Sequence, residues 1–461
     1  MRARRGCNEA PRRATLLRMR CTRLAVVMSL GSLLGLFACG DDDDGPAPFD
    51  AGPADLGMGD LGMRDLGPGR ATACGFATFP SAGLARHPYL QSTTPSSVRI
   101  AWTTTDAAGG APSVRYATSP DGPWTLVDAT SELFPTSRTG QRGDYTAHDA
   151  TLSGLTPDTT YCYEVRAGET VIGSGLALHT AWTGNTRPLT IIALGDSGTG
   201  LPGQKRLRDV LLEQEFDVFL HLGDIAYQDG SHRQLEDYFF TIYEDVLHGV
   251  PTFPTIGNHE YETELGQPYL DVYYLFEQAR RPADRERYYA FDYGDVHIVS
   301  LDSNPEMLAT VDDTSTDDMI DWLTDDLSTS TATWKIAIFH HPMYTSTGRT
   351  PSSDLRTKVL PVLEAGGIDL VLAGHVHNYE RSVPMRGGAP APTDLDAITY
   401  IVSGAGGAPL EPTMESDIFA ASNSADYSFL KLTIDGCTAQ AASIADDGST
   451  VDSFELNGCE P

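Results

Sequence analysis

Five short polar motifs, each placed directly after an apolar run, constrain the fold of this chain more than any other feature. Apolar runs of four to six residues favour strands buried in a sheet. Amphipathic stretches lie between several of the runs, and this alternation is typical of a layered α/β domain. The apolar runs are Leu189–Leu194, Val218–Leu222, Thr252–Ile256, His297–Leu301, Ile336–Phe339 and Leu370–Ala373. The amphipathic stretches are Leu207–Gln214, Leu235–Val246 and Met319–Leu327.

The polar motifs place Asp, Asn, His and Tyr side chains at the ends of these runs. Because ligands bind outside the carboxyl ends of strands in such sheets, we expect the motifs to converge on one edge. A glycine begins four of them and is expected to let the backbone turn sharply. A lone Gly-Asp or His-x-His is a weak signal, but five motifs in order favour a metal site, since carboxylate, imidazole and amide oxygen bind Fe, Zn or Mn. The motifs are Gly195-Asp196-Ser197-Gly198, Gly223-Asp224-Ile225-Ala226-Tyr227, Gly257-Asn258-His259-Glu260, His340-His341-Pro342 and Gly374-His375-Val376-His377.

This order of motifs resembles the signature of the metallophosphoesterases, and Tyr227 in the second motif resembles the purple acid phosphatases. The resemblance covers roughly residues 85–435. It implies a dinuclear metal centre with Fe(III) and a second ion, which is Fe(II), Zn or Mn. It also implies that Asp224 bridges the two ions and that His259 is the catalytic residue beside the phosphate. The implied ligands are Asp196, Asp224, Tyr227 and His377 for the first ion, and Asn258, His340 and His375 for the second.

By this resemblance the chain is expected to be an acid phosphatase that hydrolyses phosphate monoesters. A metal-bound hydroxide would attack phosphorus in line, because a metal ion lowers the pKa of its bound water. The same motifs occur in phosphodiesterases and nucleotidases, so these substrates stay open as an alternative. An inactive, surface-tethered binding lipoprotein is a second alternative. A serine hydrolase is disfavoured, because no G-x-S-x-G motif follows a strand.

One loop departs from the family pattern. Plant-type purple acid phosphatases carry a further His after the strand-end His, close to the substrate. Here the loop 344–350 contains no His. His341 and Arg349 are therefore the candidates for contact with the substrate phosphate, although structural roles stay open for both.

The segment 74–185 is expected to form a separate all-β sandwich of the fibronectin type III kind. Apolar and polar residues alternate in Val98–Trp102 and again in Tyr161–Val165. The stretch 155–161 resembles the corner that precedes a late strand of such sandwiches, with Tyr161 as the corner tyrosine. Together with Pro88–Gln91, these strands resemble the N-terminal domain of plant-type purple acid phosphatases. Residues 186–435 are then the catalytic domain, a layered β-sandwich flanked by helices, and 436–461 a short tail.

The N-terminus resembles an export signal with a lipobox. Arg20 and Arg23 precede an apolar run that ends in Leu36–Cys39, which predicts cleavage before a lipidated Cys39. Residues 1–39 are therefore the signal, whether translation starts at Met1 or Met19. Residues 40–73 are rich in Asp, Gly and Pro and predict a disordered linker. We expect an exported lipoprotein that its lipid anchor holds on the membrane, periplasmic or at the cell surface.

The net charge and the cysteines indicate which partners the protein can bind and whether it contains disulfides. The net charge of −31 disfavours nucleic-acid binding, which relies on basic side chains that neutralise phosphate. Phosphate ester substrates and the membrane are the expected partners, and the oligomeric state stays open. Four cysteines follow the linker, namely Cys74, Cys162, Cys437 and Cys459, and an even number in an exported chain predicts two disulfides. Three pairings are possible, of which Cys437 with Cys459 is favoured by proximity.

Overall fold

The computed structural model describes residues 71–80, 83–105, 109–304, 314–392, 396–419 and 422–459. The predicted signal, Cys39 and nearly all of the linker lie outside the described residues. Within the described part of the chain, no helix is both long and apolar enough to cross a membrane.

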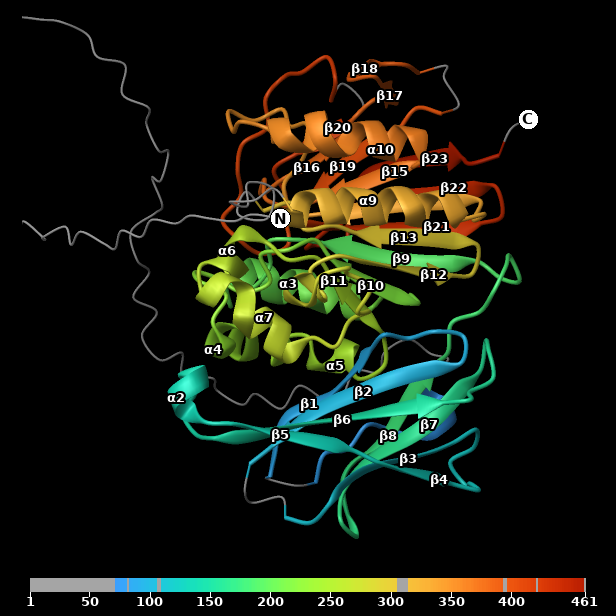
Figure 1. The fold of residues 1–461 in the computed structure, drawn as a ribbon, viewed down its shortest axis with the longest axis vertical. Coiled ribbons are helices and arrows are strands. Elements are labelled where there is room, and N and C mark those ends of the chain that lie inside the picture. Colours follow the sequence, from blue (N-terminus) through green and yellow to red (C-terminus); the bar gives the residue numbers. More distant parts are fainter. Residues whose placement is uncertain are drawn as a thin grey trace, which may run out of the picture. The chain divides into compact units, whose positions relative to one another are not determined.

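The N-terminal domain is an all-β sandwich of two four-stranded antiparallel sheets (Figure 1), as the alternating pattern predicted. Tyr161 has the role of a corner tyrosine, because its hydroxyl accepts a hydrogen bond from the backbone N–H of Thr156 at 3.0 Å. A short helix, α2 (Thr136–Thr139), follows β5. One sheet contains β1 (Leu84–Gln91), β2 (Ser97–Thr104), β6 (Tyr145–Ser153) and β5 (Thr130–Phe134). The other contains β4 (Thr125–Asp128), β3 (Pro112–Ala117), β7 (Thr160–Ala167) and β8 (Thr170–His179).

The second domain contains two larger mixed sheets. Its central strands are parallel, namely β9 to β11 in one sheet and β13, β14, β15 and β19 in the other, and antiparallel strands complete both sheets. The six-stranded sheet has the order β11 (Thr252–Pro254), β10 (Val218–His221), β9 (Leu189–Leu194), β21 (Ser428–Asp435), β22 (Thr438–Ala445) and β23 (Thr450–Asn457). The seven-stranded sheet has the order β12 (Tyr289–Tyr293), β13 (Val296–Ser300), β14 (Trp334–Phe339), β15 (Leu370–Ala373), β19 (Thr399–Ser403), β16 (Tyr379–Arg381) and β20 (Ser422–Ser424).

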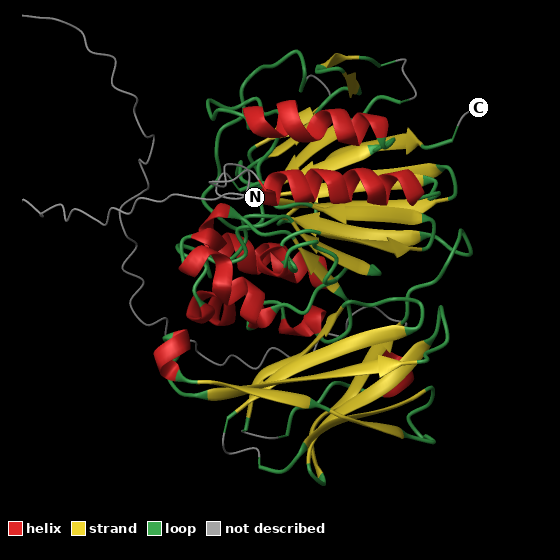
Figure 2. Cartoon of the chain, viewed as in Figure 1, coloured by secondary structure: helices red, strands yellow, loops and turns green. Residues whose placement is uncertain are grey.

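Helices cover these sheets (Figure 2). The predicted helix over 235–246 is interrupted, because a π-helical turn at 236–240 separates two short α-helices. The longer helices are α3 (Pro202–Leu212) and α9 (Thr314–Thr329). The short ones are α1 (Ala71–Cys74), α4 (His232–Leu235), α5 (Glu244–Leu247), α6 (Asn258–Tyr261), α7 (Gln267–Val272) and α10 (Leu360–Ala365). A small hairpin is formed by β17 (Met385–Arg386) and β18 (Ala389–Pro390).

Strand β14 contributes side chains to two hydrophobic cores, because successive side chains of a strand point to opposite faces. Along β14, Ile336 and Ile338 point into the core shared by the two sheets, whereas Ala337 and Phe339 point to the opposite face. The opposite face is covered by α9 and α10, whose apolar side chains include Leu323 and Leu363 (Figure 1). Because both faces of β14 are buried from residue 336 to its carboxyl end, residues 336–339 form a continuous apolar run.

The sandwich packs directly on the second domain. Tyr89 of β1 belongs to the main core of the second domain, and its hydroxyl donates to the carbonyl of Val272 at 2.6 Å. The buried Arg86 guanidinium pairs with Glu236 of the π-helical turn at 2.7 Å. Residues of the sandwich therefore join the core of the second domain, while the sandwich keeps a core of its own between its two sheets.

The C-terminal segment corrects the predicted tail. Residues 436–461 include strands β22 and β23, which extend the six-stranded sheet beyond β21. The tail prediction failed because this segment is rich in Ala, Ser and Thr and has few of the large apolar residues that usually mark a strand. Both predicted disulfides are present, Cys437 with Cys459 and Cys74 with Cys162.

A buried histidine joins β13 to α9 and links stability to pH. His297 hydrogen-bonds Asp292 through Nδ1 and Asp326 through Nε2, both at 2.7 Å. Burial alone would lower the pKa of His297, but the two carboxylates outweigh it and raise the pKa to about 9. The folded pKa lies above the unfolded value of about 6.5, so the stabilisation is complete below about pH 6.5. It is then lost as the pH rises through 9.

We therefore expect the free energy of unfolding to fall between pH 7 and 10 by on the order of 2 kcal/mol because of His297. In His297→Gln this contribution is absent, so the stability of the variant and of the wild type should converge towards pH 10. Urea unfolding at a series of pH values measures both curves. Curves that stay parallel over this range would contradict the linkage.

Candidate metal centre

The five polar motifs converge at the carboxyl ends of strands, but these strands belong to two sheets. Asp196, Asp224 and Asn258 follow β9, β10 and β11 of the six-stranded sheet. His340 and His375 follow β14 and β15 of the seven-stranded sheet. Each sheet thus supplies part of the site, and the core between the sheets fixes the distance between the two parts.

Four atoms that can each donate an electron pair to a metal ion form a first donor set, and the Tyr227 hydroxyl oxygen lies close to the other three. This oxygen lies 3.1 Å from Asp196 Oδ1, 3.1 Å from Asp224 Oδ2 and 3.2 Å from His377 Nε2. His377 Nε2 lies 3.5 Å from Asp196 Oδ1. Ligand atoms bound at about 2.0–2.2 Å to one ion lie about 3 Å apart, so this set fits a single metal ion.

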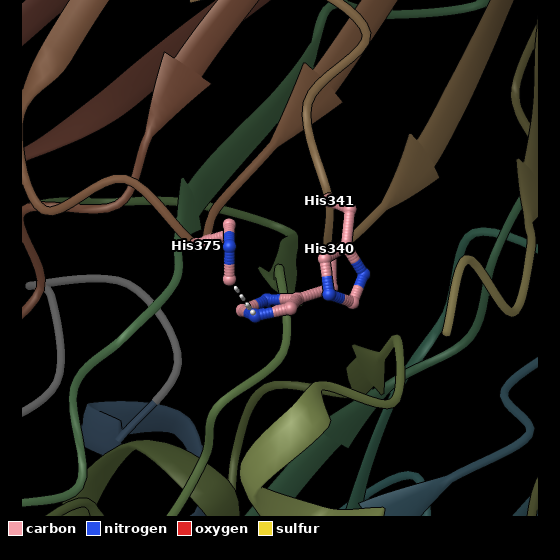
Figure 3. A group of neighbouring side chains, drawn as sticks. All are labelled: His340, His341 and His375. Atoms are coloured by element: carbon pink, nitrogen blue, oxygen red, sulfur yellow. Dashed lines mark hydrogen bonds between the residues drawn. The ribbon is translucent and has the colours of Figure 1, made fainter. Parts of the chain in front are cut away.

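A second set contains four atoms that are equally close together. His340 Nε2 lies 3.2 Å from Asp224 Oδ2 and 3.0 Å from Asn258 Oδ1. His375 Nδ1 lies 3.0 Å from Asn258 Oδ1 and 3.3 Å from His340 Nε2, and Figure 3 shows these two rings meeting. Asp224 Oδ2 belongs to both sets, so one carboxylate oxygen lies between two potential ion positions.

Backbone groups orient the donor atoms. Each carboxylate has its other oxygen held by an N–H group: His375 N–H donates to Asp196 Oδ2 at 2.8 Å, and His259 N–H to Asp224 Oδ1 at 2.9 Å. His340 Nδ1 is bonded to a backbone carbonyl oxygen at 2.8 Å, and so is His377 Nδ1. Such bonds place the proton on Nδ1 and leave Nε2 free to bind a metal.

The glycines that begin the motifs have two roles. Gly223 has a left-handed φ of 86° and makes the sharp turn that was predicted, whereas the other three act by giving space. Left-handed φ values also fall on the residues after the glycines, at Asp196 (58°), Asp224 (50°) and His375 (69°). These strained conformations lie at the proposed ligands themselves. A Cβ atom at Gly257 would lie 2.2 Å from both the backbone N and Oδ1 of Asp224, so only glycine fits there.

A buried carboxylate supports the loop that carries Asp224. Glu260 is fully buried, and its Oε2 accepts from the N–H groups of Asp224 and Gly257, both at 2.9 Å. Its Oε1 accepts from Ile225 and Ala226 at 2.8 and 3.2 Å. The sequence predicted no role for Glu260, which is the last residue of its motif. The signal for such a role was an acidic residue at the third position of a helix, where it can accept hydrogen bonds from backbone N–H groups.

The electrostatics of the centre favour positive charge beside Asp224. Burial would raise the pKa of the Asp224 carboxyl, but the imidazoles of His340 and His259 outweigh it and hold that pKa well below its ordinary value. Burial would lower the pKa of His340, yet Asp224 raises it to about 9. Metal cations suit this position for the same reason, because they offset the buried carboxylate charge.

His259 lies beside both donor sets without joining either. Its Nδ1 is hydrogen-bonded to the carbonyl of Gln228, and its Nε2 lies 3.8 Å from Asp224 Oδ2. The ring packs against Tyr227 with 4.3 Å between ring centres and is partly exposed. Nε2 is thus available to a group bound over the centre.

His341 and Arg349 both lie beside His375 of the second donor set. The Ser303 hydroxyl accepts from the backbone N–H of His341 at 2.9 Å, so its own proton can go to His341 Nδ1, 3.0 Å away. Burial and the neighbouring His340 lower the pKa of His341 to about 3, so the ring is neutral. Arg349 approaches His375 Nε2 to 3.3 Å.

A glutamate that sequence reasoning missed holds Arg349. Glu411 accepts two hydrogen bonds from its guanidinium, at 3.0 Å from Nε and 2.6 Å from Nη2. No sequence signal marks Glu411, because it lies in an irregular loop 62 residues away. Glu380 fixes the loop that carries Arg349 by accepting from the N–H and hydroxyl of Ser346 at 2.9 and 2.7 Å.

Comparisons with known proteins identify both domains of the chain. Residues 189–379 match the family described as Calcineurin-like phosphoesterase, and residues 85–183 match the Purple acid Phosphatase, N-terminal domain. This combination and order of domains decide the assignment. The chain belongs to the purple acid phosphatase family.

The individual relatives of this chain are distant in sequence. Purple acid phosphatase 18 of Arabidopsis thaliana is 29% identical over 312 residues, which cover 64% of this chain and 65% of the relative. Acid phosphatase type 7 of Mus musculus is 26% identical and covers 63% of this chain and 69% of its own length. The chain thus spans less than two thirds of the length of the first curated relatives that it matches.

The fold is shared with solved structures. The structure of a purple acid phosphatase from yellow lupin (Lupinus luteus) seeds aligns with a TM-score of 0.67 at 19% identity, covering 80% of this chain and 74% of the lupin chain. The structure of PhoD aligns with a TM-score of 0.59 at 14% identity, covering 83% and 91%. Both alignments therefore show that the chain has a known fold.

Proposed function

We propose that this protein is an exported acid phosphatase that hydrolyses phosphate monoesters at a dinuclear metal centre. The observation that carries the proposal is the pair of donor sets that share Asp224 Oδ2. Asp196, Tyr227 and His377 complete the set for Fe(III), and Asn258, His340 and His375 complete the set for Fe(II), Zn or Mn. Bound at these sets, two metal ions would lower the pKa of a water molecule and offset charge on the phosphoryl oxygens.

The protein's own residues have distinct tasks in this reaction. His259 Nε2 stabilises negative charge on the phosphoryl group or gives a proton to the departing alcohol oxygen, because it faces the centre while Gln228 holds Nδ1. The neutral His341 supplies a further hydrogen-bond donor on the side of His375. Glu260 keeps Asp224 in place. In the net reaction the ester P–O bond breaks, water supplies the new P–O bond, and one proton ends on the alcohol.

Tyr227 provides the test of the ferric site. A phenolate oxygen is an anionic donor suited to Fe(III), and its charge-transfer band is visible. We expect the oxidised wild-type protein to contain two metal ions per chain, to be coloured, and to hydrolyse phenyl phosphate at acid pH. Tyr227→Phe should lose the visible band while its far-ultraviolet circular dichroism stays unchanged. An active, colourless wild type with only divalent ions would contradict the ferric assignment.

Export is supported by the family and by the two disulfides, which are typical of oxidising compartments, whereas anchoring rests on the lipobox of the sequence. We propose that Cys39, which lies outside the described residues, carries a lipid after cleavage. Cys39→Ser should then move the phosphatase from the membrane fraction to the soluble fraction, or leave the precursor uncleaved. Mass spectrometry of the N-terminus checks the site of cleavage. A wild type that begins at another residue and does not partition with membranes would contradict the anchor.

A further inference from the structure

We propose that a polar cavity beside the second donor set binds the alcohol part of the substrate and selects an uncharged, hydroxyl-rich alcohol. This inference rests on the proposed phosphatase function and goes beyond it by naming the class of ester. The cavity has a volume of about 260 Å³. His375 lines it and also belongs to the second donor set, so an ester bound at the centre reaches the cavity with its alcohol end.

The lining of the cavity suits a small polyol. Among the described residues that line it, none is Phe, Tyr or Trp, and the rings in the lining are the imidazoles of His341 and His375, so an aromatic alcohol finds no large apolar ring to stack on. Its volume lies below the range of roughly 300–1,000 Å³ that is usual for pockets of drug-sized ligands. Five lining residues carry hydroxyl groups: Ser303, Thr345, Thr350, Ser352 and Ser353.

Two of these hydroxyls are available to a ligand. Ser303 is engaged with His341, Thr345 with Thr347 and Glu380, and Ser352 with the N–H of Leu355. In the described part of the chain, the structure shows no hydrogen bond of the Thr350 or Ser353 hydroxyl. Both residues are exposed to the cavity mouth, where each hydroxyl can donate to or accept from an alcohol.

The charge of the cavity disfavours a second anionic group. Arg349 is the cation among the lining residues, and Asp354 is an anion in the same lining. Glu411 neutralises Arg349 through two hydrogen bonds and lies outside the lining. The three side chains together carry one negative charge. A second phosphate on the alcohol would therefore meet no free positive charge.

The experiment compares two esters of one sugar, glucose 6-phosphate and glucose 1,6-bisphosphate, with phenyl phosphate as an aromatic monoester. We expect the metal-loaded wild type to show a kcat/KM about tenfold higher for glucose 6-phosphate than for the bisphosphate. Glu411→Gln frees the charge of Arg349 and should remove most of this preference. The matched control is Glu415→Gln, which deletes the same charge from an exposed residue of the same loop and should keep the preference.

A second variant tests the hydroxyl contacts. Thr350→Val keeps the shape of the side chain, and it should raise KM about threefold to tenfold more for glucose 6-phosphate than for phenyl phosphate, the effect of one neutral hydrogen bond. Equal efficiency of the two sugar esters in the wild type would overturn the proposal, and so would an unchanged preference in Glu411→Gln.

Binding separates this proposal from the phosphatase assignment. If the loaded protein hydrolyses none of the three esters, the phosphatase function fails. Calorimetric titration with intact glucose 6-phosphate and with the bisphosphate still tests the cavity, because the wild type should bind the monophosphate more tightly and Glu411→Gln should remove most of this difference. Equal affinities would overturn the cavity assignment.

Discussion

We expect Asp224→Asn to lower kcat/KM for phenyl phosphate by about a thousandfold or more and to leave fewer than two metal ions per chain. Asp224 Oδ2 is the atom that the two donor sets have in common, at 3.1 Å from the Tyr227 hydroxyl and 3.2 Å from His340 Nε2. An amide in its place has no charge to offset two cations. If the amide nitrogen takes the position of Oδ2, it offers no lone pair to either ion.

The matched control for this variant is Asp237→Asn. Asp237 is an exposed carboxylate that pairs with Arg233 at 3.4 Å, away from the donor sets. Its substitution should leave metal content and kcat/KM unchanged. Metal analysis of the purified proteins and initial rates on phenyl phosphate measure both effects. Retention of two ions and of wild-type rates in Asp224→Asn would show that the shared oxygen is not a ligand.

The second large effect is expected from Glu260→Gln. Each carboxylate oxygen of Glu260 accepts two backbone N–H groups, so the amide nitrogen of glutamine must face two donors. Losing two buried, charge-assisted hydrogen bonds should reduce the free energy of unfolding by about 3 kcal/mol. The loop of Asp224 then loses its support, and metal affinity should fall roughly 10- to 100-fold.

Glu262→Gln is the control, because Glu262 is exposed and lies two residues further along the chain. Urea unfolding of the metal-free proteins gives the stability difference, and metal titration of the folded proteins gives the affinity. The two measurements distinguish a positioning role from a purely structural one. A variant that is destabilised yet binds both metals with wild-type affinity would show that Glu260 supports the fold but does not position Asp224.

The support of Asp224 and the placement of Arg349 follow a common pattern. In both cases a buried carboxylate holds a loop through its N–H groups, Glu260 for the loop of Asp224 and Glu380 for the loop of Arg349. A carboxylate accepts N–H bonds on both of its oxygens, whereas an amide of similar size accepts them on one oxygen only. The protein therefore uses acidic residues as internal supports, and its high acidic content is not confined to the surface.

The sequence by itself determined the composition of the centre and the strands that carry it. Each polar motif directly follows an apolar run that forms a buried strand. The motif and the run can both be read from a short segment of the chain. The strand that ends before Asp196 and the strand that ends before His375 were both predicted from apolar runs. The corner role of Tyr161 was also predictable, because the corner and its hydrogen-bond partner lie within one short segment.

Only the tertiary structure decided how the parts combine. It showed that two sheets share the centre, that Glu411 holds Arg349, and that residues beyond 436 complete a sheet. The physical reason is that these features depend on contacts between segments far apart in the chain, which leave no periodic pattern in either segment. Strand β23 is stabilised by the backbone hydrogen bonds of β22, and backbone groups are the same in every sequence.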